Sequence, residues 1–159
     1  MSYSYSAREI TQMAMDVEEA SAGFYQGLAD SSTEKKFKDV FRELSSQEAG
    51  HKRQFQTMAK DLADEDARHE YAIDIYNVMK RSTAELKKQR PLKFNDGKNG
   101  RLGAELDLAA RAEQGAIDVY ELMRDVFGKP YHKLLTDIIQ VEEKHLKKVA
   151  GQKQTVVAE

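Results

Sequence analysis

Residues 37–62 read FKDVFRELSSQEAGHKRQFQTMAKDL, and the spacing of their side chains predicts a helix that buries one face. The positions that recur at steps of three and four are Phe37, Phe41, Leu44, Glu48, His51, Phe55, Met58 and Leu62. This is the period of a core-facing helical stripe. A carboxylate and an imidazole therefore stand where a helix normally carries hydrocarbon. Because an ionised carboxylate is costly to bury unless another charge neutralises it, the stripe indicates a buried cation.

The pattern returns in residues 131–149, YHKLLTDIIQVEEKHLKKV. The stripe there is Tyr131, Leu135, Ile138, Glu142, His145 and Val149. Two other stretches place a glutamate seven residues before a tyrosine, Glu18 before Tyr25 and Glu113 before Tyr120. The offset is 142 − 48 = 94 residues between the Glu-x-x-His pairs and 113 − 18 = 95 residues between the single glutamates. One shift of the sequence superposes the two halves to within one residue, which predicts two helical hairpins packed about a pseudo-twofold axis.

The composition favours one all-α domain. The chain has 159 residues, a net charge of −2, two prolines and no cysteine. The lack of cysteine excludes disulfides, iron–sulfur clusters and thiol catalysis, and without a basic patch no nucleic-acid partner is expected. No apolar run approaches the roughly 20 residues that span a bilayer, and residues 1–8 lack the apolar core of a signal peptide. We therefore expect a cytoplasmic protein with no membrane partner.

Capping and turn residues divide the chain into a helical hairpin over 7–62, a crossover over 63–103, a second hairpin over 104–151 and a tail over 152–159. Ser6 and Glu9 have the spacing of a capping box that opens the first helix, and Ser31 and Glu34 repeat that spacing before the second helix. Within the crossover, a helix is predicted from about 69 to 88 and a loop over 90–101.

Two glycines and a proline delimit the final helix. Gly128 and Pro130 predict a tight turn, with Pro130 in the first turn of the last helix. Gly151 is predicted to end that helix, which leaves the remaining residues as a frayed tail.

A candidate metal site follows from combining the two halves. Its six side chains are Glu18, Glu48, His51, Glu113, Glu142 and His145. Residues three apart share one helix face, so each Glu-x-x-His pair can address one site. A Glu from each of two helices plus a Glu-x-x-His from each of the other two is the ligand set of di-iron and di-manganese carboxylate bundles. Four carboxylates balance two divalent cations, or two trivalent cations with one oxide ion. These ligands suit iron or manganese, and zinc would bind them without redox chemistry.

Structural alternatives stay open at this stage. Each Glu-x-x-His pair could be a buried or partly exposed ion pair in a bundle without metal. Glu18 is preferred over Glu19, because the next residue on a helix is turned by about 100°, here toward the polar side. Tyr25 and Tyr120 could be packing residues with a satisfied hydroxyl, or they could hydrogen-bond a ligand carboxylate or supply an electron. Three residues outside the stripes are not expected to be ligands: His69, His132 and Glu143.

The paired Glu…Tyr helices and paired Glu-x-x-His helices resemble the rubrerythrin branch of the ferritin-like superfamily over residues 7–151. The resemblance implies a ferritin-like four-helix bundle with a long, partly helical crossover and a non-haem di-iron centre. It also implies oxidative-stress protection by reduction of hydrogen peroxide or dioxygen, and a homodimer. Glu48 and Glu142 would bridge two iron ions. Glu18 and Glu113 would bind terminally, and His51 and His145 would each cap one metal.

The sequence departs from that family in two respects. Typical rubrerythrins append a four-cysteine rubredoxin domain that delivers electrons, so a cysteine-free chain would need a separate electron donor or would turn over slowly. Many rubrerythrins also place a glutamate one turn after the ligand of the third bundle helix, where this chain has Ala116. The six-residue set also resembles bacterioferritin. Iron binding or storage without catalytic turnover is therefore the alternative function.

Overall fold

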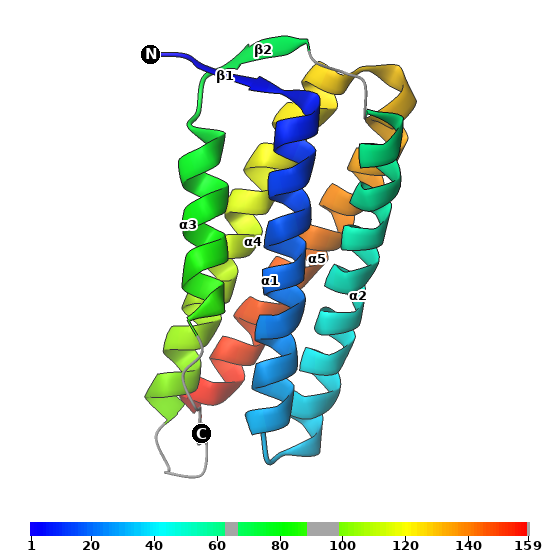
Figure 1. The fold of residues 1–159 in the computed structure, drawn as a ribbon. Coiled ribbons are helices and arrows are strands. Elements are labelled where there is room, and N and C mark those ends of the chain that lie inside the picture. Colours follow the sequence, from blue (N-terminus) through cyan, green and yellow to red (C-terminus); the bar gives the residue numbers. More distant parts are fainter. Residues whose placement is uncertain (63–66, 89–98, 159) are drawn as a thin grey trace.

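Four long helices form a bundle, and a shorter helix lies along one side of it (Figure 1). The computed structural model describes residues 1–62, 67–88 and 99–158. The elements are β1 (Tyr3–Ser6), α1 (Ala7–Ser31), α2 (Lys35–Asp61), β2 (Arg68–Tyr71), α3 (Ile75–Lys87), α4 (Asn99–Phe127) and α5 (Lys129–Ala158). Helix α1 packs mainly on α2, and α4 mainly on α5, which confirms the two predicted hairpins. Helix α3 packs against α1 and α4 and makes the crossover partly helical.

The first helix begins where the capping box predicts. The Glu9 backbone N–H donates to Ser6 Oγ at 3.2 Å, and the Ser6 backbone N–H donates to Glu9 Oε2 at 2.7 Å. The second predicted box is wrong. Helix α1 runs through Ser31, and the cap of α2 is Glu34, whose side chain makes no capping hydrogen bond. The chain turns instead at Ser32, whose backbone N–H and hydroxyl both donate to the backbone carbonyl of Leu28 in the last turn of α1.

The crossover begins as a strand, so the helix predicted from about residue 69 is wrong at its start. Strand β2 pairs antiparallel with β1, with Tyr3 opposite Tyr71. Tyr71 is buried, and its ring centroid lies 6.0 Å from that of Tyr5. Helix α3 starts only at Ile75, where the Asp74 side chain accepts a hydrogen bond from the Asn77 N–H. Of the predicted loop over 90–101, residues 90–98 lie outside the described part, and 99–101 already belong to α4.

The second hairpin is longer than predicted at both ends. Helix α4 begins at Asn99 rather than near residue 104, and α5 continues to Ala158 instead of ending at Gly151. The extension of α5 buries Val156, which packs in the apolar cluster that also holds Leu102. The tight turn at Gly128 is confirmed, because this residue has a φ of 81°, which glycine adopts without steric cost.

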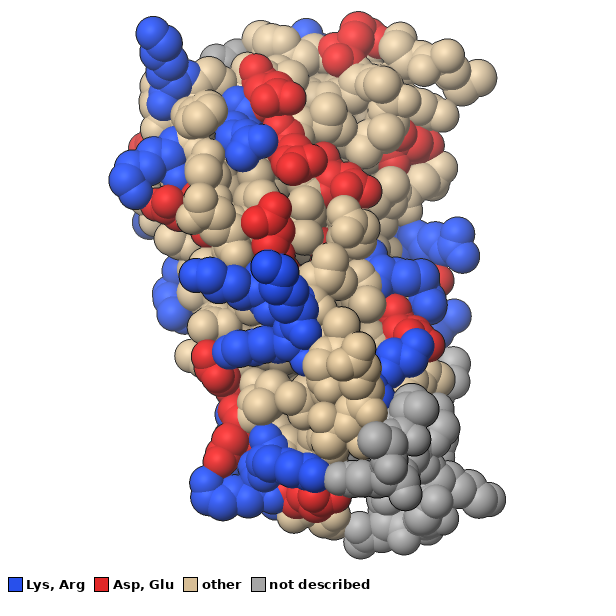
Figure 2. Space-filling model, turned by 180° about the vertical axis from the view of Figure 1, so that it is seen from behind, with Lys and Arg blue, Asp and Glu red and all other residues tan. Residues whose placement is uncertain are grey.

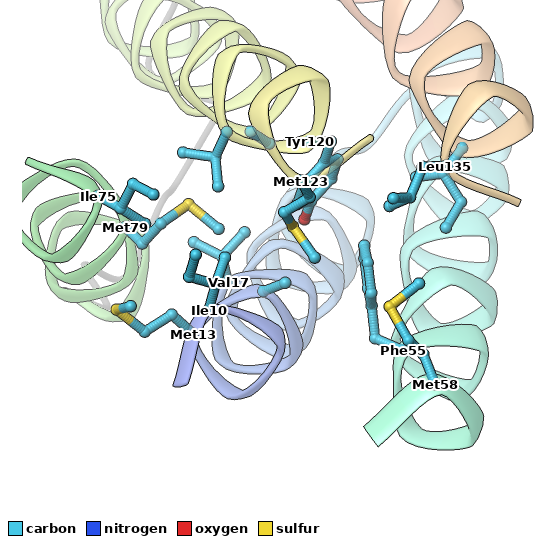
Figure 3. Packing of buried hydrophobic residues seen from close by; sticks show 14 of the residues in the cluster. Ile10, Met13, Val17, Phe55, Met58, Ile75, Met79, Tyr120, Met123 and Leu135 are labelled. Carbon is cyan, nitrogen blue, oxygen red and sulfur yellow. The ribbon is translucent and has the colours of Figure 1, made fainter. Parts of the chain in front are cut away.

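The apolar core has two main parts, one toward each end of the bundle. Near the β-strands, Ile10, Phe55, Tyr120, Met123 and Leu135 belong to one cluster, part of which Figure 3 shows. Near the opposite end a second cluster packs Leu28, Phe41, Leu44, Leu106 and Val149. On each long helix the two groups are separated by the glutamate or Glu-x-x-His pair that the sequence singles out. The candidate ligands therefore lie at mid-height, between two apolar layers.

The exterior carries charges of both signs. On the face seen in Figure 2, Lys and Arg side chains are interspersed with Asp and Glu. Some pair across helices, as Lys148 does with Glu43 at 2.6 Å. Among the described helices, none is both long and apolar enough to cross a membrane.

Candidate metal centre

All six predicted ligand side chains meet inside the bundle. Their exposed fractions are between 1% and 5%. They form two overlapping groups whose ligand atoms lie within 4.8 Å of one another. One group is Glu18, Glu48, His51 and Glu142, and the other is Glu48, Glu113, Glu142 and His145. Glu48 and Glu142 belong to both groups, and each remaining residue belongs to one. This is the arrangement expected of two adjacent cations that share two carboxylates.

Each imidazole turns its Nδ1 atom toward three carboxylates. His51 Nδ1 lies 2.5 Å from Glu142 Oε1, 3.4 Å from Glu48 Oε2 and 3.5 Å from Glu18 Oε2. The corresponding distances from His145 Nδ1 are 3.0 Å to Glu142 Oε2, 3.4 Å to Glu48 Oε1 and 3.8 Å to Glu113 Oε2. The centroids of the His51 and His145 rings lie 5.7 Å apart, and the two ring planes are inclined by 28°. The halves of the repeat therefore present equivalent donor sets to neighbouring points.

Unsatisfied polar atoms test whether these residues fit a metal. Glu18 Oε2, Glu48 Oε2, His51 Nδ1 and Glu142 Oε1 are buried, and none of the contacts among them, including the 2.5 Å contact of His51 Nδ1 with Glu142 Oε1, has hydrogen-bond geometry. They come from the four residues of the first group. An unsatisfied buried polar atom costs about 1–3 kcal/mol, and more when it is charged. One cation bound among them would satisfy all four, so the donor set fits a metal centre.

The charges of the cluster perturb its own titration. Burial disfavours an imidazolium, but the facing carboxylates of Glu142, Glu18 and Glu48 outweigh it and raise the pKa of His51 to about 12. Carboxylates likewise raise the pKa of His145 to about 12 against the effect of burial. Burial and neighbouring carboxylates raise the pKa of Glu142 to about 8 and that of Glu48 well above its usual range. Bound metal would therefore replace protons on both imidazoles.

Comparison with known proteins decides the family. The sequence matches the Rubrerythrin family model over residues 9–152. The chain belongs to the rubrerythrin family. The six buried Glu and His side chains described above form the cluster that could bind metal in this family member. None of the curated proteins compared with the chain matches it.

Two solved structures share the fold of this rubrerythrin-family chain. One is a Thermotoga maritima protein described provisionally as a ferritin-like diiron-carboxylate protein. It has 24% identity and a TM-score of 0.72, covering 96% of this chain and 97% of that one. The other is a hypothetical protein from Pyrococcus furiosus with 15% identity and a TM-score of 0.75, covering 97% and 92%. These likenesses confirm the predicted ferritin-like bundle.

Two buried tyrosines of this family member link the halves crosswise. Tyr25 on α1 donates a hydrogen bond to Glu113 Oε1 on α4 at 2.5 Å, and Tyr120 on α4 donates to Glu18 Oε1 on α1. Both rings also pack among apolar side chains. Each tyrosine is therefore a packing residue and also hydrogen-bonds a candidate ligand carboxylate. Burial, together with nearby carboxylates, raises both phenol pKa values well above 10. Each phenol therefore keeps its proton and holds one carboxylate in orientation.

Sequence reasoning missed Gln47. This half-buried residue precedes Glu48 on α2, and its Oε1 accepts a hydrogen bond from His145 Nε2 at 2.7 Å. The sequence did carry a signal for this residue. At Gln47 the repeat is broken, because the position 94 residues later is Val141, which has no polar group.

The acidic and histidine residues that were not expected to be ligands lie outside the cluster. Glu19 is exposed and pairs with Lys52 at 2.9 Å, and His132 and Glu143 are also exposed. His69 is exposed on β2, opposite Tyr5.

Proposed function

We propose that this chain is a non-haem di-iron oxidoreductase that reduces hydrogen peroxide or dioxygen and protects the cytoplasm from oxidants. The observation that carries the proposal is the pair of overlapping Glu/His groups, buried between two apolar layers and containing orphaned donor atoms. In a purely structural network these atoms would be expected to form hydrogen bonds, whereas here they converge at ion-pair distances without hydrogen-bond geometry. Membership of the rubrerythrin family supports the same conclusion.

The proposed ligand roles follow the sharing of residues between the groups. Glu48 and Glu142, which belong to both groups, would bridge two iron ions. Glu18 and Glu113 would each bind one iron, and His51 and His145 would each cap one. Two ferrous ions, when bound, supply the two electrons that convert one hydrogen peroxide and two protons into two water molecules. Manganese could occupy the same ligands, and zinc would occupy them without redox activity.

The chain's own residues prepare the site for this reaction. Apolar side chains on both sides, among them Phe41 and Phe55, exclude bulk water and strengthen the electrostatic interactions inside. Tyr25 and Tyr120 hold Glu113 and Glu18 in orientation through their hydroxyl protons. We also propose that either phenol can pass an electron to the site, its hydroxyl proton moving at the same time to the carboxylate that it already hydrogen-bonds. A separate donor protein or small reductant would restore the ferrous state after each turnover.

Anaerobic loading with Fe(II), followed by addition of hydrogen peroxide, tests the proposal. We expect one peroxide to be consumed for two ferrous ions, with near-ultraviolet absorption of a ferric carboxylate centre. A Glu142→Gln variant should lose the response, and Glu143→Gln, at the exposed neighbouring position, should retain it. Iron that stays ferrous after peroxide and after dioxygen would exclude the proposed activity.

Iron storage is separated from this function by stoichiometry. The oxidoreductase is expected to be a homodimer with two metal ions per chain. Storage in a ferritin-like shell requires a particle of many subunits that holds far more iron per chain. Size-exclusion chromatography combined with an iron count distinguishes the two.

A further inference from the structure

The pseudo-twofold repeat is broken beside the two histidines. His145 Nδ1 faces the carboxylates, so its Nε2 carries the proton that is donated to Gln47 Oε1. The Gln47 amide nitrogen donates in turn to Glu43 Oε1 at 3.4 Å, and Lys148 donates to the same oxygen at 2.6 Å. This chain of hydrogen bonds runs from the buried ring to the surface of α2 and α5, and holds His145 from behind.

The matching positions in the other half cannot build this support. The shift of 94 residues places Val141 where Gln47 stands, and a valine side chain accepts no hydrogen bond. The same shift places Asp137 in the position of Glu43, and Asp137 pairs with Lys133 on its own helix at 2.6 Å. In the part of the chain that the structure describes, no hydrogen bond from behind His51 corresponds to that of Gln47.

A surface hollow lies over His51 instead. Its volume is about 520 Å³, and His51, Gly50 and Val141 are among the residues that line it, with Gln47 also part of its wall. His51 has an exposed fraction of 5%, against 1% for His145. Gly50 adds no side chain to the hollow, and a larger residue would fit there, because a Cβ at this position would meet only the Arg53 side chain, at 3.7 Å. The His51 side of the cluster is thus closer to solvent and less restrained.

We propose that, because of these differences, the two metal positions exchange their ions with solvent at different rates. Gln47 acts as a positioning residue that retains the metal of the His145 group, and the metal of the His51 group enters and leaves through the hollow. Groups that orient metal-bound histidines from behind typically change metal affinity by about 10–100-fold. The inference rests on the metal-binding part of the proposed function and not on its redox chemistry.

Release of zinc from the full-length, Zn(II)-loaded protein to a colorimetric chelator tests the inference without any catalytic activity. We expect two kinetic phases of one zinc per chain each. Gln47→Leu should accelerate the slow phase by about 10-fold or more. It should leave the fast phase within twofold, because leucine has nearly the volume of glutamine and keeps that wall of the hollow in place. The matched control is Gln56→Leu, an exposed glutamine on the same helix, which should change neither phase.

Two gain-of-function variants act on the other position. Val141→Gln supplies the acceptor that the second half lacks, and Gly50→Leu fills the hollow. Each should slow the fast phase and leave the slow phase unchanged, with a circular dichroism melt confirming the fold. A single phase in the unsubstituted protein, or equal acceleration of both phases in Gln47→Leu, would overturn the inference. If zinc exchange is biphasic as expected but iron-loaded protein ignores peroxide, only the proposed redox function fails. A chain that binds no zinc refutes both.

Discussion

Replacing Glu48 with glutamine separates a metal centre from a structural ion-pair network, because this residue belongs to both ligand groups. Glu48 is 1% exposed, and burial with the facing carboxylates raises its pKa well above the usual range. A group with a raised pKa in the fold costs the metal-free protein stability as pH rises above the ordinary carboxyl pKa. The Glu48→Gln variant removes that cost. We therefore expect the free energy of unfolding of its metal-free form at pH 7 to be no more than about 1 kcal/mol below that of the unsubstituted protein.

The metal-loaded proteins should behave in the opposite way. Metal at 100 times its dissociation constant stabilises the fold by about 2.7 kcal/mol per site, or about 5 kcal/mol for two sites. For a chain of this length each kcal/mol raises the melting temperature by about 2–4 °C, so the unsubstituted protein should gain roughly 10–20 °C. Glu48→Gln removes an oxygen ligand from both groups and should lose most of that gain.

Thermal unfolding followed by circular dichroism, with a chelator and then with excess Zn(II) or anaerobic Fe(II), measures both effects. Glu143→Gln is the matched control, since it makes the same change on the exposed face of α5 and should keep the full stabilisation. The reasoning is refuted if Glu48→Gln lowers the stability of the metal-free protein by several kcal/mol and metal still raises its melting temperature as in the unsubstituted chain.

Three further predictions concern the buried aromatic residues. Tyr120→Phe removes the hydrogen bond to the Glu18 carboxylate and should destabilise the metal-free fold by about 1.5–3 kcal/mol in urea denaturation, and an unchanged midpoint would contradict this role. Burial raises the pKa of Tyr71 to about 12, and burial with nearby carboxylates raises those of Tyr25 and Tyr120 well above 10. Because the fold favours the neutral phenols, their stabilising contribution is complete below pH 10 and is lost as pH rises toward 12. An absorbance titration should therefore show these three ionising only as the helical circular dichroism signal disappears. Phe55→Ala empties a fully buried position whose ring centroid lies 5.0 Å from that of Tyr120, and should cost about 3–5 kcal/mol of unfolding free energy, with a loss below 1 kcal/mol arguing against close packing there.

The repeat in the sequence was enough to predict the bundle and the candidate ligands. A stripe such as Phe41, Glu48, His51 and Phe55 obeys helical periodicity, which depends only on neighbours within two turns. The stripe therefore identifies the buried face before any partner helix is known. The structure buries all six candidate ligands of the two halves and brings them together, as the matching offsets of 94 and 95 residues predict.

Local patterns failed where a distant partner competes with them. Residues from about 69 onward have the composition of a helix, but the chain's first residues pair with them, and Tyr71 is buried beside Tyr5 as a strand. Gly151 reads as a helix end, yet the packing of Val156 in the core carries α5 past it. Neither contact can be inferred from spacing, because each joins residues far apart in the sequence.

By itself the sequence determined which side chains face inward and that two acids and an imidazole from each half are buried at one depth. Only the tertiary structure decided their partners. Glu18 and Tyr25 share a helix face but lie about 10 Å apart along the axis, too far to bond, so each pairs with the other half. The asymmetry at Gln47 and Val141 likewise acquires its meaning only from the tertiary structure, which places Gln47 behind His145. Periodicity specifies a direction from each helix axis, and the packing of α1 and α2 against α4 and α5 specifies what lies there.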